Sequence, residues 1–384
     1  MKIPFNRPYL TGKEIEYISD AIEGSQRGSS ISGDGPYTYK VQELLEDRFG
    51  AKKALLTTSC TSAIELATHL LNLRPGDEVI LPSFTFVSTA NPIVIAGAKP
   101  VFAEISEDTC NIDPDDIRKK ITPKTKAIYP VHYGGVACPM DEIMEIAREY
   151  DLKVVEDAAQ GVNAKYKNRY LGTIGDFGCY SFHETKNYTC GEGGALLINS
   201  KDKSIFERAE IIREKGTNRS KFFRGEVDKY TWVDIGSSYL PSDILAAFLY
   251  AQLEMLDEIK EKRMRIWEGY YSELKPFEKK GLLRLPFVPE YAEHNAHIFY
   301  ILLNTASERD AIMEKLKLNG IHAVFHYLPL HTSPMGQRMG YKLGDLTSTE
   351  GVSERILRLP IHAEMKRNEA IEVLDSLFKY ITEG

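Results

Sequence analysis

The sequence predicts an α/β protein, in which a large domain with a mostly parallel sheet precedes a small α+β domain. From residue 53 onward, short apolar runs alternate with helix-length amphipathic stretches, a pattern typical of parallel βαβ units. A long helical stretch at 241–274 then links the two domains. The chain of 384 residues has room for both, at about 150 residues per domain.

The predicted elements follow in order along the chain. Two helices open it: Thr11–Glu23, capped by Thr11, and Tyr37–Phe49. The buried strands that follow are Lys53–Leu56, Val79–Leu81, Pro100–Ile105, Lys126–Pro130 and Leu152–Val155. The helices between them are Thr61–Leu71, Val87–Ile95, Asp113–Lys120 and Met140–Tyr150. Because these strands are apolar throughout, we expect helices on both faces of the sheet.

Beyond residue 170, glycines are frequent, and the predicted strands and helices no longer alternate regularly. We expect strands at Cys179–Phe182 and Ala195–Ile198, and a helix at Ser204–Lys215. The long helix at 241–274 is expected to break near Leu256–Lys260. The tail predicts strand His297–Leu303, helix Ser307–Leu318, strand His322–His326 and a last helix through Ile371 and Ile381. The domains are therefore expected at residues 1–245 and 246–384.

Composition excludes several classes of protein. The chain has 48 Lys+Arg against 55 Asp+Glu, a net charge of −7, which argues against a nucleic-acid-binding surface. Five cysteines are few and odd in number, which argues against a disulfide scaffold. Prolines and polar residues interrupt the uncharged stretch Val79–Ala98, and the N-terminus lacks a signal-peptide pattern. We therefore expect a cytoplasmic protein that binds neither nucleic acid nor membrane.

Two motifs point to chemistry at strand ends. An apolar strand ends in Glu156 and Asp157, and α/β proteins bind ligands at the carboxyl ends of parallel strands. Lys186 lies between a glycine-flanked β run and the glycine-rich loop Gly191–Gly194, where backbone can approach a ligand closely. A lysine in such a desolvated place can lose its proton and attack a carbonyl carbon. Taken singly, the acids also fit a solvated strand end, and the lysine fits an ordinary surface charge.

Two further motifs suggest a phosphate and a flat ring. At Thr57–Ile64 a strand runs into a helix whose first turn is all small hydroxyl residues, which suits either a phosphate or simple N-capping by Ser59 or Thr61. Phe84 and Phe86 follow another strand, where an aromatic ring can stack on a cofactor or join the core. Together the four motifs match what pyridoxal 5′-phosphate requires. No histidine pair has metal-ligand spacing, so no metal is expected.

The chain resembles the DegT/DnrJ-type sugar-nucleotide aminotransferases. The resemblance rests on Glu156-Asp157-Ala158-Ala159-Gln160, on Ser181-Phe182-His183-x-x-Lys186-Asn187 and on Gly191-Glu192-Gly193-Gly194. It implies the aspartate-aminotransferase-like fold (PLP fold type I), with a seven-stranded sheet in the large domain. Stretches at 131–138, 213–220 and 324–331 are most similar to the subgroup of dTDP-4-amino-4,6-dideoxygalactose transaminases.

The resemblance also implies roles for individual residues. Lys186 would bond the cofactor and move protons, Asp157 would pair with the pyridinium nitrogen, and His183 would belong to the catalytic group. The other implied cofactor contacts are Gln160 at the phenolic oxygen, Phe86 on the ring, and Thr61, Ser62 and Ser181 at the phosphate. Ser238 stands where many relatives place an Asn of the neighbouring subunit, and Lys215 where many have His. The substrate-binding candidates are Lys215, Arg219, His326, Tyr327 and His331.

The implied reaction transfers the amino group of L-glutamate to dTDP-4-dehydro-6-deoxy-D-glucose in a homodimer with shared active sites. The products would be 2-oxoglutarate and dTDP-4-amino-4,6-dideoxy-D-galactose, which serves polysaccharides such as lipopolysaccharide and enterobacterial common antigen. Three alternatives remain open: another nucleotide-linked keto sugar (UDP, GDP or 3-keto), a sugar-deoxygenating relative, and a non-catalytic relative. Lys186 argues against the second, because those relatives carry His at that position.

Overall fold

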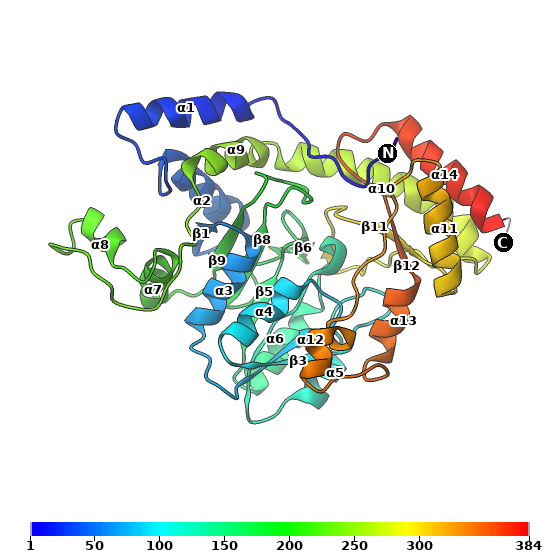
Figure 1. Ribbon diagram of the computed structural model, residues 1–384, viewed down its shortest axis with the longest axis horizontal. Coiled ribbons are helices and arrows are strands. Elements are labelled where there is room, and N and C mark those ends of the chain that lie inside the picture. Colours follow the sequence, from blue (N-terminus) through cyan, green and yellow to red (C-terminus); the bar gives the residue numbers. More distant parts are fainter. Residues whose placement is uncertain (1, 383–384) are drawn as a thin grey trace.

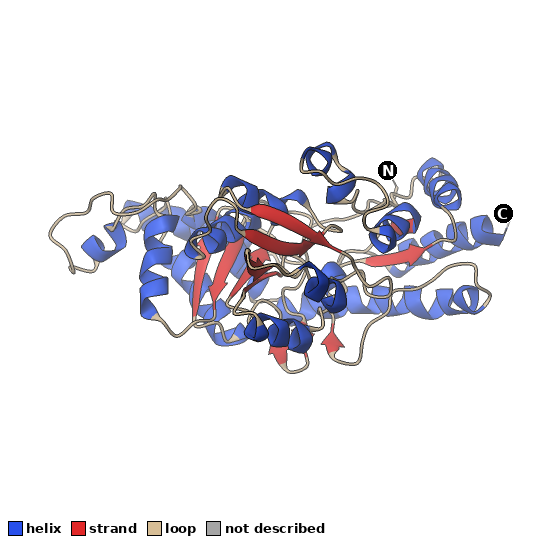
Figure 2. Cartoon of the chain, turned by 90° about the horizontal axis from the view of Figure 1, so that it is seen from below, coloured by secondary structure: helices blue, strands red, loops and turns tan. Residues whose placement is uncertain are grey.

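The computed structural model describes residues 2–382 and is built around a seven-stranded sheet (Figures 1 and 2). The strand order is β1-β9-β8-β5-β4-β2-β3. The bounds are β1 Lys53–Thr57, β2 Glu78–Pro82, β3 Lys99–Ala103, β4 Thr125–Ile128, β5 Lys153–Asp157, β8 Phe177–Ser181 and β9 Gly194–Ile198. Only β9 in this sheet runs antiparallel to its neighbours, β1 and β8. The predicted α/β class with a mostly parallel seven-stranded sheet is confirmed.

Helices cover both faces of this sheet, as the apolar strands require. The helices of the first 253 residues are α1 Glu14–Gln26, α2 Pro36–Phe49, α3 Cys60–Leu70, α4 Val87–Ile95, α5 Pro114–Lys120, α6 Met140–Glu149, α7 Lys203–Arg213, α8 Arg219–Phe223 and α9 Asp243–Leu253. On one face, α2, α6 and α9 bury Leu45, Ile146 and Leu249 in a single core. On the other, α3 and α7 bury Ile64 and Ile212 in a second core. Successive strand residues alternate between these cores, since strand side chains point to opposite faces.

The C-terminal part has a core of its own around a two-stranded sheet. Its elements are α10 Leu256–Lys279, β11 Phe299–Leu302, α11 Ala306–Leu318, α12 Pro334–Arg338, α13 Thr347–Arg355, β12 Ile356–Leu359 and α14 Arg367–Thr382, with a short turn of helix at Leu330–Thr332. A second short turn, Tyr133–Gly135, belongs to the first part of the chain and lies between β4 and α6. A small sheet joins β10 Ala292–Glu293 to β6 Lys165–Tyr166 and β7 Arg169–Tyr170. The N-terminal Ile3 lies in this C-terminal core and pairs with Ile321. The domain division at 245/246 stays a prediction.

Three local predictions need correction or refinement. The first helix begins at Glu14 and Thr11 does not cap it, because the Glu14 carboxylate instead accepts the Thr11 and Gly12 backbone N–H groups. The strand predicted at His322–His326 is wrong: within that stretch only Val324 forms a β-bridge, with Arg358 on the edge of β12 that β11 leaves free. The expected break in the long helix is confirmed, and α10 begins at Leu256.

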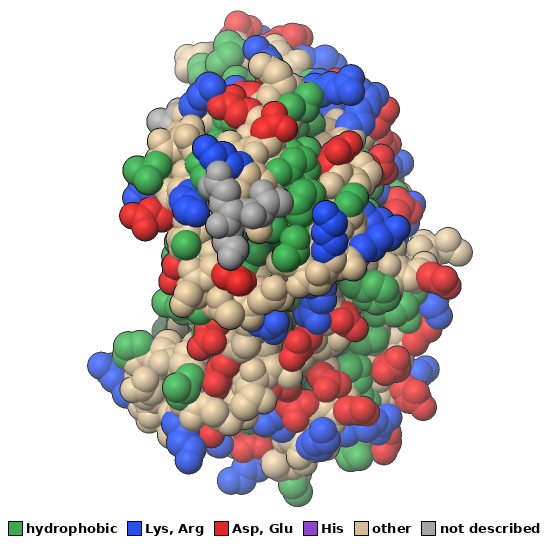
Figure 3. All heavy atoms as spheres, turned by 90° about the vertical axis from the view of Figure 1, so that its right-hand side faces the viewer, with side chains coloured by type: hydrophobic (Ala, Val, Ile, Leu, Met, Phe, Trp, Pro, Cys, Tyr) green, Lys and Arg blue, Asp and Glu red, His purple; other side chains and the backbone are tan. Residues whose placement is uncertain are grey.

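The surface carries mixed charge. On the end of the molecule seen in Figure 3, basic and acidic side chains are interspersed, with small hydrophobic areas between them. No helix within residues 2–382 is long and apolar enough to cross a membrane.

Candidate active site

The candidate residues converge at one edge of the central sheet. Strands β1, β2, β4, β5 and β8 run in the same direction, so the segments after their last residues meet at the carboxyl edge. Asp157 ends β5 and Ser181 ends β8. The antiparallel β9 starts at the same edge, and it brings the loop Gly191–Gly194 there as well.

Asp157 is a buried carboxylate held by two donors. Its Oδ2 accepts the Thr89 hydroxyl at 2.7 Å and its Oδ1 accepts the Ala159 backbone N–H at 3.1 Å. Thr89 is positioned in turn by the Thr85 hydroxyl, 2.8 Å away. No basic side chain forms an ion pair with Asp157 among the described residues, so its carboxylate oxygens, apart from the Thr89 and Ala159 donors, are open to a partner supplied from outside the chain.

The neighbouring Glu156 faces the other way and is completely buried. Its Oε1 accepts the backbone N–H groups of Ile174 and Gly175, both at 2.6 Å. Its Oε2 accepts the Gly172 N–H at 2.8 Å and the His132 Nε2–H at 2.9 Å. His132 Nδ1 accepts the Cys138 N–H at 3.1 Å, which leaves the proton on Nε2. Glu156 therefore anchors the loop before β8 and fixes the strand end that presents Asp157.

Lys186 lies in a turn that the glycine-rich loop stabilises. Its backbone N–H donates to the His183 carbonyl at 2.9 Å, and Glu184 N–H donates to the Gly191 carbonyl at 2.8 Å. Burial lowers the pKa of Lys186, and the Arg358 guanidinium acts in the same direction, whereas Cys60 and Asp157 raise it. No hydrogen bond or ion pair engages the Lys186 amine within residues 2–382. A desolvated amine of this kind is a better base and nucleophile than a surface lysine.

The start of α3 is lined with hydroxyl groups. Ser59 caps the helix by accepting the Ser62 N–H at 3.1 Å, which confirms the N-capping interpretation for Ser59. The Ser62 hydroxyl lies 2.8 Å from that of Thr58, and Thr61 donates to Ser88 at 2.8 Å. A Cβ at Gly194 would lie 2.4 Å from the Cys60 nitrogen, so only glycine allows β9 to approach this helix start so closely. Free backbone N–H groups and hydroxyls at one helix start suit a phosphate.

Aromatic side chains and Gln160 form a wall beside this edge. Phe86 is 56% exposed, and its ring centroid lies 6.4 Å from that of Tyr327. Gln160 donates through Nε2 to the Tyr327 hydroxyl at 3.1 Å and accepts the Gly134 N–H at 2.6 Å. The structure thus brings Gln160 and Tyr327 together from distant parts of the chain, and it leaves the Phe86 ring free to stack on a flat ligand.

His326 completes the wall and is held neutral. The Tyr133 hydroxyl lies 2.9 Å from His326 Nδ1. Burial holds the pKa of His326 well below its ordinary value, and the Arg358 and Lys186 cations add to that effect. Arg358, which carries no role in the resemblance, lies beside this wall, because its Nη2 donates to the Phe325 carbonyl at 3.2 Å. Its sequence signal is an arginine inside the apolar strand Ile356–Leu359.

Other predicted site residues lie elsewhere or are already bonded. His183 is half-exposed, with Nδ1 2.9 Å from the Thr185 hydroxyl and Nε2 3.4 Å from Glu192. His331 is fully buried between Ser83 at 2.7 Å and Glu350 at 2.8 Å. Both ring nitrogens of His331 are thus occupied within the chain, so the predicted substrate contact is not available to it.

Lys215, Arg219 and Ser238 lie on the segment 215–238 at the α7–α8 end of the molecule (Figure 1). Lys215 and Ser238 are exposed. Arg219 is paired with the buried Glu214 at 2.5 Å and stacks on Phe223.

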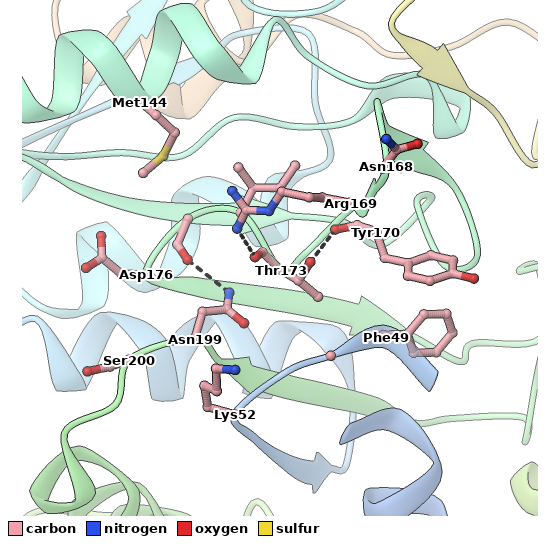
Figure 4. Close-up of a pocket in the computed structure, with 13 residues that line it drawn as sticks. Phe49, Lys52, Met144, Asn168, Arg169, Tyr170, Thr173, Asp176, Asn199 and Ser200 are labelled. Carbon is pink, nitrogen blue, oxygen red and sulfur yellow. Dashed lines mark hydrogen bonds between the residues drawn. The ribbon is translucent and has the colours of Figure 1, made fainter. Parts of the chain in front are cut away.

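A separate cavity of about 520 Å³ lies at the opposite, amino edge of the sheet (Figure 4). Its lining residues precede β1 and β8 and follow β9, as Lys52, Asp176 and Asn199 illustrate. In Figure 4, Arg169 points toward the Thr173 backbone, to whose carbonyl it donates. The cavity is therefore distinct from the Lys186 site.

Comparison with known proteins gives consistent matches along nearly the whole chain. Residues 12–378 match the DegT/DnrJ/EryC1/StrS aminotransferase family. The chain is 36% identical over 389 residues to the uncharacterized protein MJ1066 of Methanocaldococcus jannaschii, covering 100% of this chain and 98% of that protein. It is 32% identical over 383 residues to the spore coat polysaccharide biosynthesis protein SpsC of Bacillus subtilis, covering 98% and 96%.

Among solved structures, the fold matches Spr1654 of Streptococcus pneumoniae, which is named as a sugar aminotransferase. The PLP form of that protein aligns with a TM-score of 0.91 and 25% identity, covering 100% of this chain and 99% of that one. Its PMP form gives a TM-score of 0.91 and 26% identity over 99% of each chain.

Proposed function

The chain belongs to the DegT/DnrJ/EryC1/StrS aminotransferase family, and we propose that it transfers the amino group of L-glutamate to a nucleotide-linked 4-keto-6-deoxyhexose. The observation that carries the proposal is that one sheet edge presents both a buried carboxylate without an ion-pair partner, Asp157, and a lysine whose pKa burial lowers, Lys186. Relatives solved with PLP and PMP support the same cofactor here.

The side chains at this edge fit pyridoxal 5′-phosphate. Asp157 would hold a proton on the ring nitrogen, since a nearby carboxylate favours the charged form of a base. The hydroxyls of Thr61, Ser62 and Ser181 would hold the phosphate at the start of α3. Phe86 would cover the ring, and Gln160 would face its phenolic oxygen. When bound, the cofactor supplies an electron sink for the substrate carbon.

Lys186 is the chain's proton carrier in this proposal. Because burial lowers its pKa, a larger fraction of its amine is neutral near pH 7 than for a surface lysine. A neutral amine can take a proton from the α carbon of the amino donor and return it to a carbon two atoms away, a 1,3-proton shift that requires the amine to reach both carbons.

We propose dTDP-4-dehydro-6-deoxy-D-glucose as the acceptor and dTDP-4-amino-4,6-dideoxy-D-galactose as the product. The stretches 131–138, 213–220 and 324–331, which resemble that transaminase subgroup, support this choice. SpsC, named for spore coat polysaccharide biosynthesis, supports a role in polysaccharide assembly. A UDP-linked, GDP-linked or 3-keto sugar is the alternative acceptor.

We further propose a homodimer that shares its active sites through the segment 215–238. This segment exposes several large apolar side chains, with Phe223 68% and Trp232 76% exposed. Exposed apolar surface of this kind is typical of an interface, and two-fold dimers are the commonest oligomers. In the dimer, Ser238 would approach the phosphate site of the neighbouring subunit. Analytical ultracentrifugation should give the dimer mass for the wild type and the monomer mass for Trp232→Glu; a monomeric wild type would contradict the proposal.

The reaction is tested with purified protein, pyridoxal 5′-phosphate, L-glutamate and the dTDP-keto sugar. We expect 2-oxoglutarate to form in equal amount to the amino sugar, and Lys186→Ala to abolish both. If 2-oxoglutarate appears only with a UDP- or GDP-linked keto sugar, the acceptor is wrong. If no keto sugar consumes the amino group, the aminotransferase proposal is wrong.

A further inference from the structure

The turn at residues 294–297, between β10 and β11, contains a strained residue. Ala296 is fully buried and has a φ of 52°, in the left-handed region that a residue with a Cβ rarely adopts. Arg263 of α10 holds this conformation, since its Nε donates to the Ala296 carbonyl at 3.0 Å and its Nη2 to the His297 carbonyl at 2.8 Å. Strain persists only where surrounding contacts enforce it, and it is concentrated at functional sites. The strained backbone therefore indicates that this turn places particular side chains.

The 294–297 turn bonds the residue directly after Lys186. The buried Asn187 donates through Nδ2 to the Asn295 carbonyl at 2.9 Å, and its Oδ1 lies 3.0 Å from His297 Nδ1. Because an amide oxygen can only accept, the proton of the imidazole is on Nδ1. Both ends of the Asn187 carboxamide are thus bonded to one turn, which restrains the backbone that carries Lys186.

The same turn also holds the backbone of Gln160, the other residue expected beside the cofactor ring. Asn295 donates through Nδ2 to the carbonyls of Gln160 and Val162, both at 2.8 Å. Its Oδ1 accepts the His297 N–H at 3.1 Å. A Cβ at residue 135 would lie 2.0 Å from that oxygen, so Asn295 fits only against glycine. One turn of the C-terminal part therefore ties together two segments of the candidate active site.

His297 makes its bond to Asn187 as an uncharged ring. Burial holds the pKa of His297 well below its ordinary value, and the charge of Lys186 acts in the same direction. The guanidinium groups of Arg263 and Arg358 add to that effect. A neutral imidazole can donate to Asn187 without adding a further positive charge beside the lysine. The contact therefore bears on where Lys186 lies and leaves its charge unchanged.

We propose that His297 is a positioning residue, whose hydrogen bond to Asn187 holds the Lys186 amine where it can reach the cofactor aldehyde. The proposal rests on the proposed function in one respect, that Lys186 bonds the cofactor, and it is independent of the donor and of the keto sugar. In that step the lysine nitrogen bonds the aldehyde carbon, and the aldehyde oxygen leaves as water with both amine protons. His297 should therefore affect this step and leave the rest of the cofactor pocket unchanged.

The test compares two cofactor forms on the apoprotein. Pyridoxal 5′-phosphate can bond Lys186, whereas pyridoxamine 5′-phosphate has no aldehyde and reports only on the remaining contacts. We expect His297→Leu to slow capture of saturating pyridoxal 5′-phosphate by about tenfold, because a misplaced reacting group lowers the rate steeply. The dissociation constant of pyridoxamine 5′-phosphate should stay within about threefold of wild type. The pH midpoint of capture should not move, since neither leucine nor the neutral histidine carries charge.

Three further variants complete the test. His297→Asn places an amide N–H donor where Nδ1 lies, and it should restore most of the capture rate. His322→Leu is the matched control, because His322 is also half-buried but packs against Phe5, 6.3 Å between ring centroids, and it should capture at the wild-type rate. If His297→Leu does not fold, His297→Gln replaces it, since its amide lies one bond further from the backbone and should not restore the rate.

The outcomes separate this proposal from the proposed function. Equal losses with both cofactor forms would overturn it in favour of a general structural role. A wild-type capture rate in His297→Leu would overturn it as well, and a shifted midpoint would show that His297 acts on the charge of Lys186 instead. If the wild type forms no bond between Lys186 and pyridoxal 5′-phosphate, the Lys186 assignment fails together with the role of His297. If that bond forms at the same rate without His297, only the positioning role is refuted.

Discussion

Replacing Glu156 with Gln should destabilise the protein strongly although the two side chains have the same shape. The carboxylate accepts two N–H groups at each oxygen: Ile174 and Gly175 at one, Gly172 and His132 at the other. An amide keeps one accepting oxygen and turns the other end into a donor. Whichever way the amide turns, two N–H groups face an NH₂ group and lose their acceptor.

The magnitude follows from that count. Hydrogen bonds to charged groups contribute about 1.5–3 kcal/mol each, so two lost bonds cost about 3–6 kcal/mol. His132 cannot compensate by moving its proton to Nδ1, because that nitrogen accepts the Cys138 N–H. Such a loss is a large part of the 5–15 kcal/mol, roughly, that stabilises a typical protein.

Equilibrium urea unfolding followed by circular dichroism measures the effect. Glu43→Gln, on the exposed face of α2, is the matched control and should stay within about 0.5 kcal/mol of wild type. If Glu156→Gln loses no more than Glu43→Gln, Glu156 does not anchor the loop before β8, and the reasoning fails.

Three further predictions concern single side chains. The rate at which the apoprotein captures pyridoxal 5′-phosphate should rise with pH through a midpoint below the ordinary lysine pKa of 10.5; a midpoint at or above 10.5 would contradict the burial of Lys186. Thr89→Val removes the hydroxyl that Asp157 accepts and should weaken cofactor binding about tenfold by fluorescence titration; unchanged binding would separate Asp157 from the cofactor. Burial lowers the pKa of His362 to about 4, so the unfolded chain binds a proton at this histidine more tightly than the folded chain does. The free energy of unfolding should therefore fall as pH decreases from about 6.5 to 4. His362→Leu should flatten that fall in urea titrations, and an unchanged pH slope would contradict the explanation.

The central sheet was predictable because its strands are short, apolar and separated by helices. Each predicted strand of the parallel set lies within a few residues of its observed bounds. Helix α13 was not predicted, because Thr347–Arg355 buries little apolar surface, chiefly Val352, and therefore has no amphipathic pattern. Strand β12 was not predicted, because it is only four residues long and Arg358 interrupts its apolar pattern. Short elements are stabilised by contacts across the fold, which local pattern does not reveal.

The site shows the same limit. Asp157 was predictable as a site residue from its place at a strand end. Nothing in the sequence indicates that the adjacent Glu156 instead anchors the loop before β8. The two side chains differ because neighbouring residues of a strand point to opposite faces. His331 and His326 look alike in sequence, yet one is enclosed by Ser83 and Glu350 and the other faces Tyr133. Such differences arise from which distant segments pack together.

The most direct test of the account is to find the residue that bonds the cofactor. Protein loaded with pyridoxal 5′-phosphate is reduced with borohydride, digested and analysed by mass spectrometry. We expect the pyridoxyl phosphate mass on Lys186 alone, and none on the same peptide after prior conversion of the cofactor by L-glutamate. A label on another lysine, or no label on protein that retains the cofactor, would contradict the assignment of this sheet edge as the active site.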